Sequence, residues 1–130
     1  MKRNILSIGS NNAMTHILKT TLGYSYHLIS VEDIFKAMYL LKQKREIDII
    51  IIDIDYQIKE SIDFVLHVCT SKLYNQSLIV LSNLENKKHL HLLPQGSVYE
   101  YFIKPFDPIQ LLHCINKLMT SISMSQISQQ

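Results

Sequence analysis

The chain has 130 residues, of which 47% are hydrophobic and 18% are charged, and its formal net charge is +2. This length fits one domain with a single core, and the composition is that of a folded protein rather than a disordered one. A net charge this small gives no support for nucleic-acid binding, which needs a concentrated basic face, and no apolar run reaches the roughly 18 residues of a membrane span. We therefore expect a single cytoplasmic domain that binds neither nucleic acid nor membrane.

Residues 5–8 form the first predicted element, a short apolar strand. The turn formers at 9–12 end this strand and include good helix caps, so a helix should follow. Apolar residues then recur at helical spacing over 14–22. Gly23 stands where a left-handed cap would end that helix.

A second unit of strand and helix comes next. Residues 26–31 are a strand candidate, and the charges of Glu32 and Asp33 favour a helix start directly after it. Basic residues at 42–45 should end this helix. Its apolar face is expected to consist of Ile34, Phe35, Met38 and Leu41.

The most distinctive stretch is the run of four isoleucines at 49–52, which ends at Asp53. A run without polar alternation suits a strand that is covered on both faces, in the middle of a parallel sheet. Asp53 would then lie at the carboxyl edge of the sheet, where open α/β sheets bind their ligands. After a polar loop, a third helical pattern covers residues 62–69.

Two further strands are predicted in the second half of the chain. Residues 78–81 are wholly apolar and end at Ser82. Residues 84–93 predict a short helix, which the following proline stops. Residues 99–103 predict the fifth strand, and Lys104 follows it directly.

The last predicted helix begins at Asp107 and Pro108, because aspartate is a good cap and proline suits the first helical position. Residues 120–130 are rich in serine and glutamine and have little to bury. We therefore expect one domain over residues 1–119, followed by a flexible tail or the start of a linker.

Five strands alternate with five helices, which predicts an α/β fold built on a doubly wound parallel sheet. Asp53, Ser82 and Lys104 each follow a strand at one edge of this sheet. A carboxylate, a hydroxyl and an ammonium that converge suit a phosphoryl group. The carboxylate can attack phosphorus while the other two groups hold its oxygens.

From residue 3 to residue 119 the chain resembles the receiver domain of two-component response regulators. The resemblance is carried by residues 48–53, Leu81-Ser82 and, most specifically, Tyr101-Phe102-Ile103-Lys104-Pro105-Phe106 before Asp107-Pro108. It implies a flavodoxin-like (βα)5 fold with strand order 2-1-3-4-5. The roles that it implies are phospho-acceptor for Asp53, switch hydroxyl for Ser82, phosphate-binding cation for Lys104 and rotamer-switching aromatic for Tyr101.

The chain departs from this family where the metal would bind. In the family, the first strand ends in two adjacent acids that hold Mg²⁺, and the matching positions here are Gly9 and Ser10. Only Asp53 and Asp55 would remain as metal ligands, so we expect Mg²⁺ binding to be weak or absent. Without the metal, phosphoryl transfer brings negative charge onto Asp53 with only Lys104 to neutralise it. We therefore predict a degenerate receiver, and a standing ion pair between Asp53 and Lys104 is one form that it can take.

Two other interpretations stay open. A strand that ends in Asp53-Ile54-Asp55 is also similar to the haloacid-dehalogenase phosphatases, with Asp53 as nucleophile and Asp55 as general acid. That family needs a further acid after the lysine, and the nearest one, Asp107, is better used as a helix cap. Separately, backbone donors in the turn at 9–12 could hold an anion beside Lys104.

A lone receiver domain has no room for an effector, so its output must be contact with another protein and we expect no enzyme activity. The resemblance implies a histidine kinase or a phosphotransfer protein upstream. It places the output face on the fourth helix, the fifth strand and the fifth helix, which here hold His89, Tyr101 and Gln110. A downstream protein or a second copy of the chain would bind there.

Overall fold

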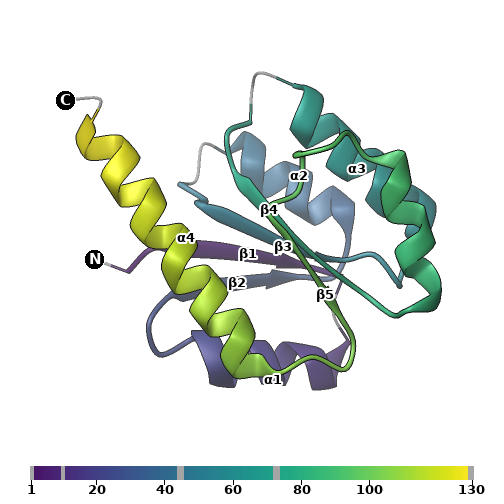
Figure 1. Ribbon diagram of the computed structural model, residues 1–130, viewed down its shortest axis with the longest axis horizontal. Helices are drawn as coiled ribbons and strands as arrows, with labels where there is room; N and C mark the ends of the chain where they lie inside the picture. Colours follow the sequence, from purple (N-terminus) through teal and green to yellow (C-terminus); the bar gives the residue numbers. More distant parts are fainter. Residues whose placement is uncertain (1, 10, 44–45, 72–73, 129–130) are drawn as a thin grey trace.

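Five parallel strands form one sheet in the order β2-β1-β3-β4-β5 (Figure 1). This computed structural model of the chain describes residues 2–9, 11–43, 46–71 and 74–128. The strands are β1 (Asn4–Ile8), β2 (His27–Val31), β3 (Ile49–Asp53), β4 (Ser77–Ser82) and β5 (Glu100–Ile103). The predicted fold class and strand order are therefore confirmed.

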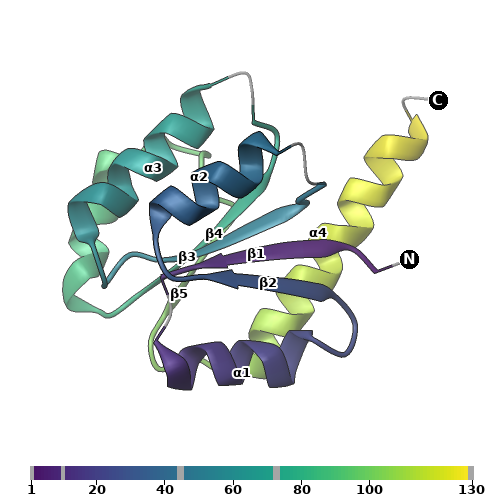
Figure 2. The same cartoon turned by 180° about the vertical axis from the view of Figure 1, so that it is seen from behind.

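Helices cover both faces of this sheet. Their bounds are α1 (Asn12–Leu22), α2 (Ile34–Lys42), α3 (Ile58–Thr70), the 3₁₀-helix η1 (Glu85–Leu92) and α4 (Pro108–Ser128). α1 and α4 lie on one face, and α2, α3 and η1 lie on the other (Figures 1 and 2). Within the part of the chain described above, no helix is both long enough and apolar enough to cross a membrane.

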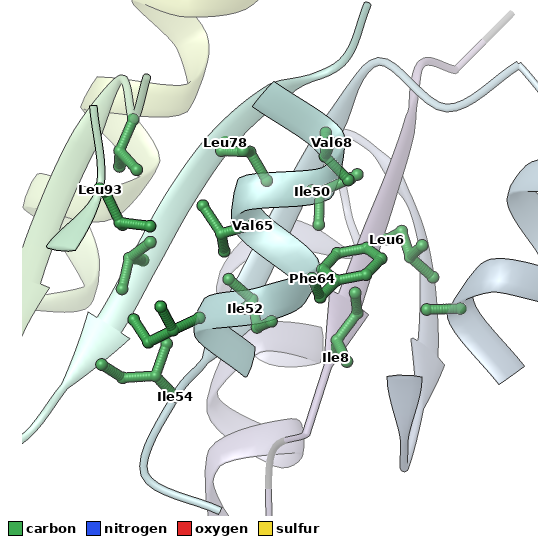
Figure 3. Packing of buried hydrophobic residues seen from close by; sticks show 14 of the residues in the cluster. Leu6, Ile8, Ile50, Ile52, Ile54, Phe64, Val65, Val68, Leu78 and Leu93 are labelled. Carbon is green, nitrogen blue, oxygen red and sulfur yellow. The ribbon is translucent and has the colours of Figure 1, made fainter. Parts of the chain in front are cut away.

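β3 is the centre of the hydrophobic core, and all five of its residues are buried. Its isoleucines alternate between the two faces: Ile50 and Ile52 belong to the cluster under α2 and α3, whereas Ile49 and Ile51 pack with α1 and α4. Figure 3 shows Ile50 and Ile52 beside Phe64 and Val65 of α3. The prediction of a strand covered on both faces is confirmed.

Two local predictions were wrong. Gly23 caps the end of α1 in a right-handed conformation, with φ −65°, and its amide donates to the Lys19 carbonyl at 2.9 Å. The absence of a side chain at Gly23 lets its backbone lie close to the Lys19 carbonyl, since a Cβ would lie 2.5 Å from that oxygen. Phe35 is 89% exposed rather than buried. The face of α2 that meets the sheet carries Ala37 and Leu41, and Phe35 points away from it.

The C-terminal third differs from expectation in two elements. The helix predicted over 84–93 forms as the 3₁₀-helix η1. α4 does not give way to an irregular tail at residue 120 but continues to Ser128. Ile122 packs on the core, and the Arg3 guanidinium donates to the Ser123 hydroxyl at 2.8 Å. These contacts hold the added turns, which run past the sheet near the N-terminus (Figures 1 and 2).

Candidate functional site

The carboxyl edge of the sheet brings three of the predicted residues together. Asp53 ends β3, Ser82 ends β4, and Lys104 directly follows β5. The strands are neighbours in register, with Asp53 beside Leu81 and Ser82 beside Ile103. The Lys104 amide extends the ladder by donating to the Ser82 carbonyl at 2.8 Å.

Lys104 bridges two carboxylates. Its Nζ lies 2.7 Å from Asp53 Oδ2 and 2.7 Å from Asp55 Oδ2. The Asp53 side chain is only 2% exposed and that of Lys104 is 23% exposed, so solvent screens these ion pairs weakly. The sequence suggested the pair with Asp53, but it suggested a metal-binding role for Asp55 rather than this second ion pair.

Asp55 is fixed by two further donors. Its Oδ2 accepts a hydrogen bond from the backbone N–H of Asn83, and its Oδ1 accepts one from the side-chain amide of Asn86, both at 2.8 Å. Asn83 in turn accepts from the Asn86 backbone N–H at 2.7 Å, which orders the start of η1. Sequence reasoning missed Asn83 and Asn86. Their only signal was a cluster of amide side chains directly after the fourth strand.

The three charged groups have shifted pKa values. Burial raises the pKa of Asp53, and the hydrogen bond from Lys104 offsets part of this rise. Burial also acts to raise the pKa of Asp55, but hydrogen bonds from Lys104 and Asn86 outweigh it, so that this pKa is lowered. Burial alone would lower the pKa of Lys104, yet its hydrogen bonds to Asp53 and Asp55 raise it. Asp55 and Lys104 are thus held in their charged forms.

Ser82 and Tyr101 stand apart from this ion-pair network. The Ser82 hydroxyl is buried and has no hydrogen-bond partner in the part of the chain that the structure describes. Tyr101 lies in the middle of β5 beside Val80, and its side chain is partly exposed. Among the described residues no hydrogen bond joins the Tyr101 hydroxyl to Asp53, Ser82 or Lys104.

Gly9 occupies the first of the two positions that hold acids in receiver domains. Its φ is +82°, and its amide donates to the Val31 carbonyl at 3.1 Å. A Cβ at Gly9 would lie 3.1 Å from the Asp53 carbonyl oxygen, so a side chain here would be strained and crowded. The second position, Ser10, lies outside the described residues.

The residues that the structure describes do not fit Mg²⁺ in this arrangement. Each of the four carboxylate oxygens of Asp53 and Asp55 already accepts a hydrogen bond from a donor of the chain itself, and a metal ion would compete with these donors. A pocket of about 210 Å³ beside Asp53 is lined by Gly9, Glu32 and Asp33, but Asp33 caps α2 by accepting from the Lys36 amide at 2.9 Å. The carboxylate of Asp55 lies beside Lys104. An anion held by the turn at 9–12 stays a prediction, because Ser10 of that turn lies outside the described residues.

Comparison with known proteins gives a likeness of fold. The sequence matches no protein-family model and no curated protein. Among solved structures, a response regulator from Thermotoga maritima is similar with a TM-score of 0.77 and 16% identity, over 92% of this chain and 99% of that one. A response regulator receiver domain protein from Clostridium thermocellum has a TM-score of 0.80 and 16% identity, over 94% and 98% of the two chains.

A third similar structure is the signal receiver domain of an HD-domain-containing protein from Pseudomonas fluorescens. Its TM-score is 0.76 and its identity is 21%, over 93% of this chain and 97% of that one. All three likenesses span nearly the full length of both partners, so they concern the whole architecture rather than a shared motif. The chain therefore has the fold of response-regulator receiver domains.

Proposed function

We propose that the chain is a receiver module of two-component signalling whose acceptor site is closed by its own ion pairs. The observation that carries this proposal is the position of the Lys104 ammonium, 2.7 Å from both Asp53 and Asp55. In this proposal Asp53 is the acceptor position, Lys104 the phosphate-binding cation and Ser82 the switch hydroxyl. Asp55 takes the place that an added phosphoryl group would otherwise fill.

The donors around Asp55 support this role. A phosphoryl group on Asp53 would need a cation and hydrogen-bond donors for its oxygens. Lys104, the Asn83 amide and the Asn86 side chain are such donors, and all three already bind the Asp55 carboxylate. A phosphoryl oxygen would have to displace a carboxylate that is held in its charged form.

The residues at the positions of the metal-binding acids also support a closed site. Phosphoryl transfer to a carboxylate relies on a divalent cation to neutralise the charge that accumulates. Gly9 supplies no ligand, and its left-handed backbone disfavours any residue that could. We therefore propose that Mg²⁺-dependent phosphorylation of Asp53 is weak or absent, and that signalling depends on protein contacts. A histidine kinase or phosphotransfer protein upstream remains a prediction from the resemblance.

A phosphatase of the haloacid-dehalogenase type is not favoured. Its general acid must hold a proton to give to the leaving group. Asp55 has a lowered pKa and both of its oxygens accept hydrogen bonds from the protein. Asp107, the acid that such an enzyme would need for its metal, caps α4 by accepting from the Ile109 amide at 2.9 Å.

The test is incubation with acetyl phosphate and Mg²⁺, followed by intact-mass measurement. We expect the wild type to stay unmodified and to match the Asp53→Asn variant, which has no acceptor carboxylate. A stoichiometric mass gain in the wild type that Asp53→Asn abolishes would contradict the closed site. Turnover of an aryl phosphate that depends on both Asp53 and Asp55 would instead support the phosphatase.

A further inference from the structure

A groove between α2 and α3 is lined by both apolar and acidic side chains. Its volume is about 600 Å³, and among the residues that the structure describes no lysine or arginine lines it. We call it the acidic groove. Its apolar lining residues are Ile34, Phe35, Met38 and Phe64, and its acidic lining residues are Asp33, Glu60 and Asp63. Three carboxylates on a groove in a chain whose net charge is +2 indicate an occupant that is basic as well as apolar.

The same chain presents such a surface on η1. Lys87 and Lys88 are exposed and flanked by exposed leucines, and Glu85 is the only acid of this helix. We call the exposed basic and leucine residues of η1 and of the position before it the basic ridge: Leu84, Lys87, Lys88, His91 and Leu92. Among the residues that the structure describes, Lys87 and Lys88 of the ridge have no salt-bridge partner. The same is true of Glu60 and Asp63 of the groove.

The order of the helices makes the two surfaces complementary under two-fold symmetry. α3 contacts α2 on one side and η1 on the other, so it separates the groove from the ridge within a single layer (Figure 2). A two-fold axis that passes above α3 places the groove of the first copy against the ridge of the second, and the ridge of the first copy against the groove of the second. Such a contact is closed, because each copy uses the same patch.

We propose that the chain forms a two-fold dimer in which the basic ridge of each copy fills the acidic groove of the other. Phe35 at the lip of the groove is 89% exposed, and Tyr39 follows one turn later on the same side of α2. Exposed aromatic side chains of this kind supply much of the binding energy of protein interfaces. The dimer needs about 800 Å² from each copy, roughly a tenth of the 8134 Å² surface of the chain.

The experiment is sedimentation velocity of the whole chain from micromolar to millimolar concentration. We expect a monomer–dimer equilibrium that weakens as salt is added, since ion pairs at an interface rim are screened. Phe35→Ser should weaken the dimer by at least about tenfold, which corresponds to about 1.4 kcal/mol. Tyr24→Ser is the matched control, because Tyr24 is an aromatic that is 91% exposed but lies in the turn after α1.

Charge reversal tests the pairing of ridge with groove. Asp63→Lys and Lys88→Glu should each weaken the dimer, and the variant that carries both should recover most of the loss. A chain that stays monomeric at every concentration would overturn the proposal. It would do so even if the monomer bound an added leucine- and lysine-rich helical peptide through Phe35, because the occupant of the groove would then be another protein. A dimer that Phe35→Ser leaves intact but Ile109→Ser on α4 disrupts would also overturn it, because it places the interface on η1, β5 and α4. None of these outcomes depends on phosphorylation at Asp53.

Discussion

The carboxyl edge of the sheet has two halves that differ in how their polar groups are satisfied. Over β3, β4 and β5, one ammonium and two carboxylates are joined to each other and to two asparagines. Over β1 and β2, the chain turns through Gly9 and leaves a pocket lined by Glu32 and Asp33. The first half keeps its charges paired, whereas the second lacks the acids that a receiver domain uses for metal.

The first half shows how a buried carboxylate is stabilised by a cation of the same chain. Asp53 is 2% exposed, and a carboxylate at that depth is costly unless a cation accompanies it. Lys104 supplies the cation for Asp53 and also pairs with Asp55, and the negative charge in excess on Asp55 is stabilised by the donors of Asn83 and Asn86. Substitutions in each half of the edge should therefore have different effects on stability.

The largest effect is expected from Lys104→Met, which leaves Asp53 and Asp55 side by side with no cation. We expect a loss of about 3 kcal/mol in the free energy of unfolding, measured in urea at neutral pH. The matched control is Lys36→Met, because Lys36 pairs with Glu32 at 3.5 Å on the open surface. That variant should change stability by no more than about 0.5 kcal/mol. Equal losses in the two variants would show that the Lys104 pairs add nothing.

Gly9→Ala tests the other half of the edge. Both the positive φ and the Asp53 carbonyl at 3.1 Å oppose a side chain, so a loss of roughly 2 kcal/mol is expected. Gly96→Ala is the control, since Gly96 has φ +83° with nothing within 4 Å of its would-be Cβ. Its loss should be nearer roughly 1 kcal/mol. If the two glycines respond alike in urea denaturation, the crowding beside Asp53 has no energetic consequence.

Asn86→Ala removes one of the donors to Asp55 and should cost about 1 kcal/mol of stability. The Asn83 amide and Lys104 remain in place, so the site should stay closed to acetyl phosphate. Thermal unfolding measures the stability, and intact mass measures the modification. Phosphorylation of this variant at Asp53 would show that Asn86 alone keeps the site closed.

The smallest expected effect is a change in how steeply the free energy of unfolding depends on pH. Because the pKa of Asp55 is lowered in the folded state, its ionised side chain stabilises the fold at any pH above the ordinary pKa of 3.8. This stabilisation is lost as the pH falls through the pKa of the folded state. The pKa of Asp53 is raised, so its contribution has the opposite sign and declines as pH rises above 3.8. Relative to wild type, Asp55→Asn should therefore flatten the acid limb of the stability profile and Asp53→Asn should steepen it. Equal profiles for the two variants would contradict the opposed shifts.

Most of the fold follows from patterns that the sequence displays. The isoleucine run and the alternation of strands with helices fix a parallel sheet, and the ends of parallel strands place Asp53, Ser82 and Lys104 on one edge. The bridge from Asp55 was not predictable, because it depends on the path of the chain after β3 and β4 rather than on periodicity.

Two other errors have different causes. Phe35 faces solvent because the helical period places Ile34, Ala37, Met38 and Leu41 on the face that packs on the core, and Phe35 lies to the side of that face. α4 continues past residue 119 because Arg3, distant in sequence, donates to Ser123. Such contacts between distant parts of the chain leave no trace in a local pattern.

The central claim is that Asp53 and Asp55 share Lys104 and are not available to a metal. The most direct measurement is a pH titration of the two side-chain carboxyl ¹³C resonances by NMR, with and without millimolar Mg²⁺. We predict that Asp55 titrates below 3.8 and Asp53 above it, and that Mg²⁺ moves neither midpoint. A midpoint of Asp53 that falls when Mg²⁺ is added would show that the metal binds there, and it would contradict the closed site.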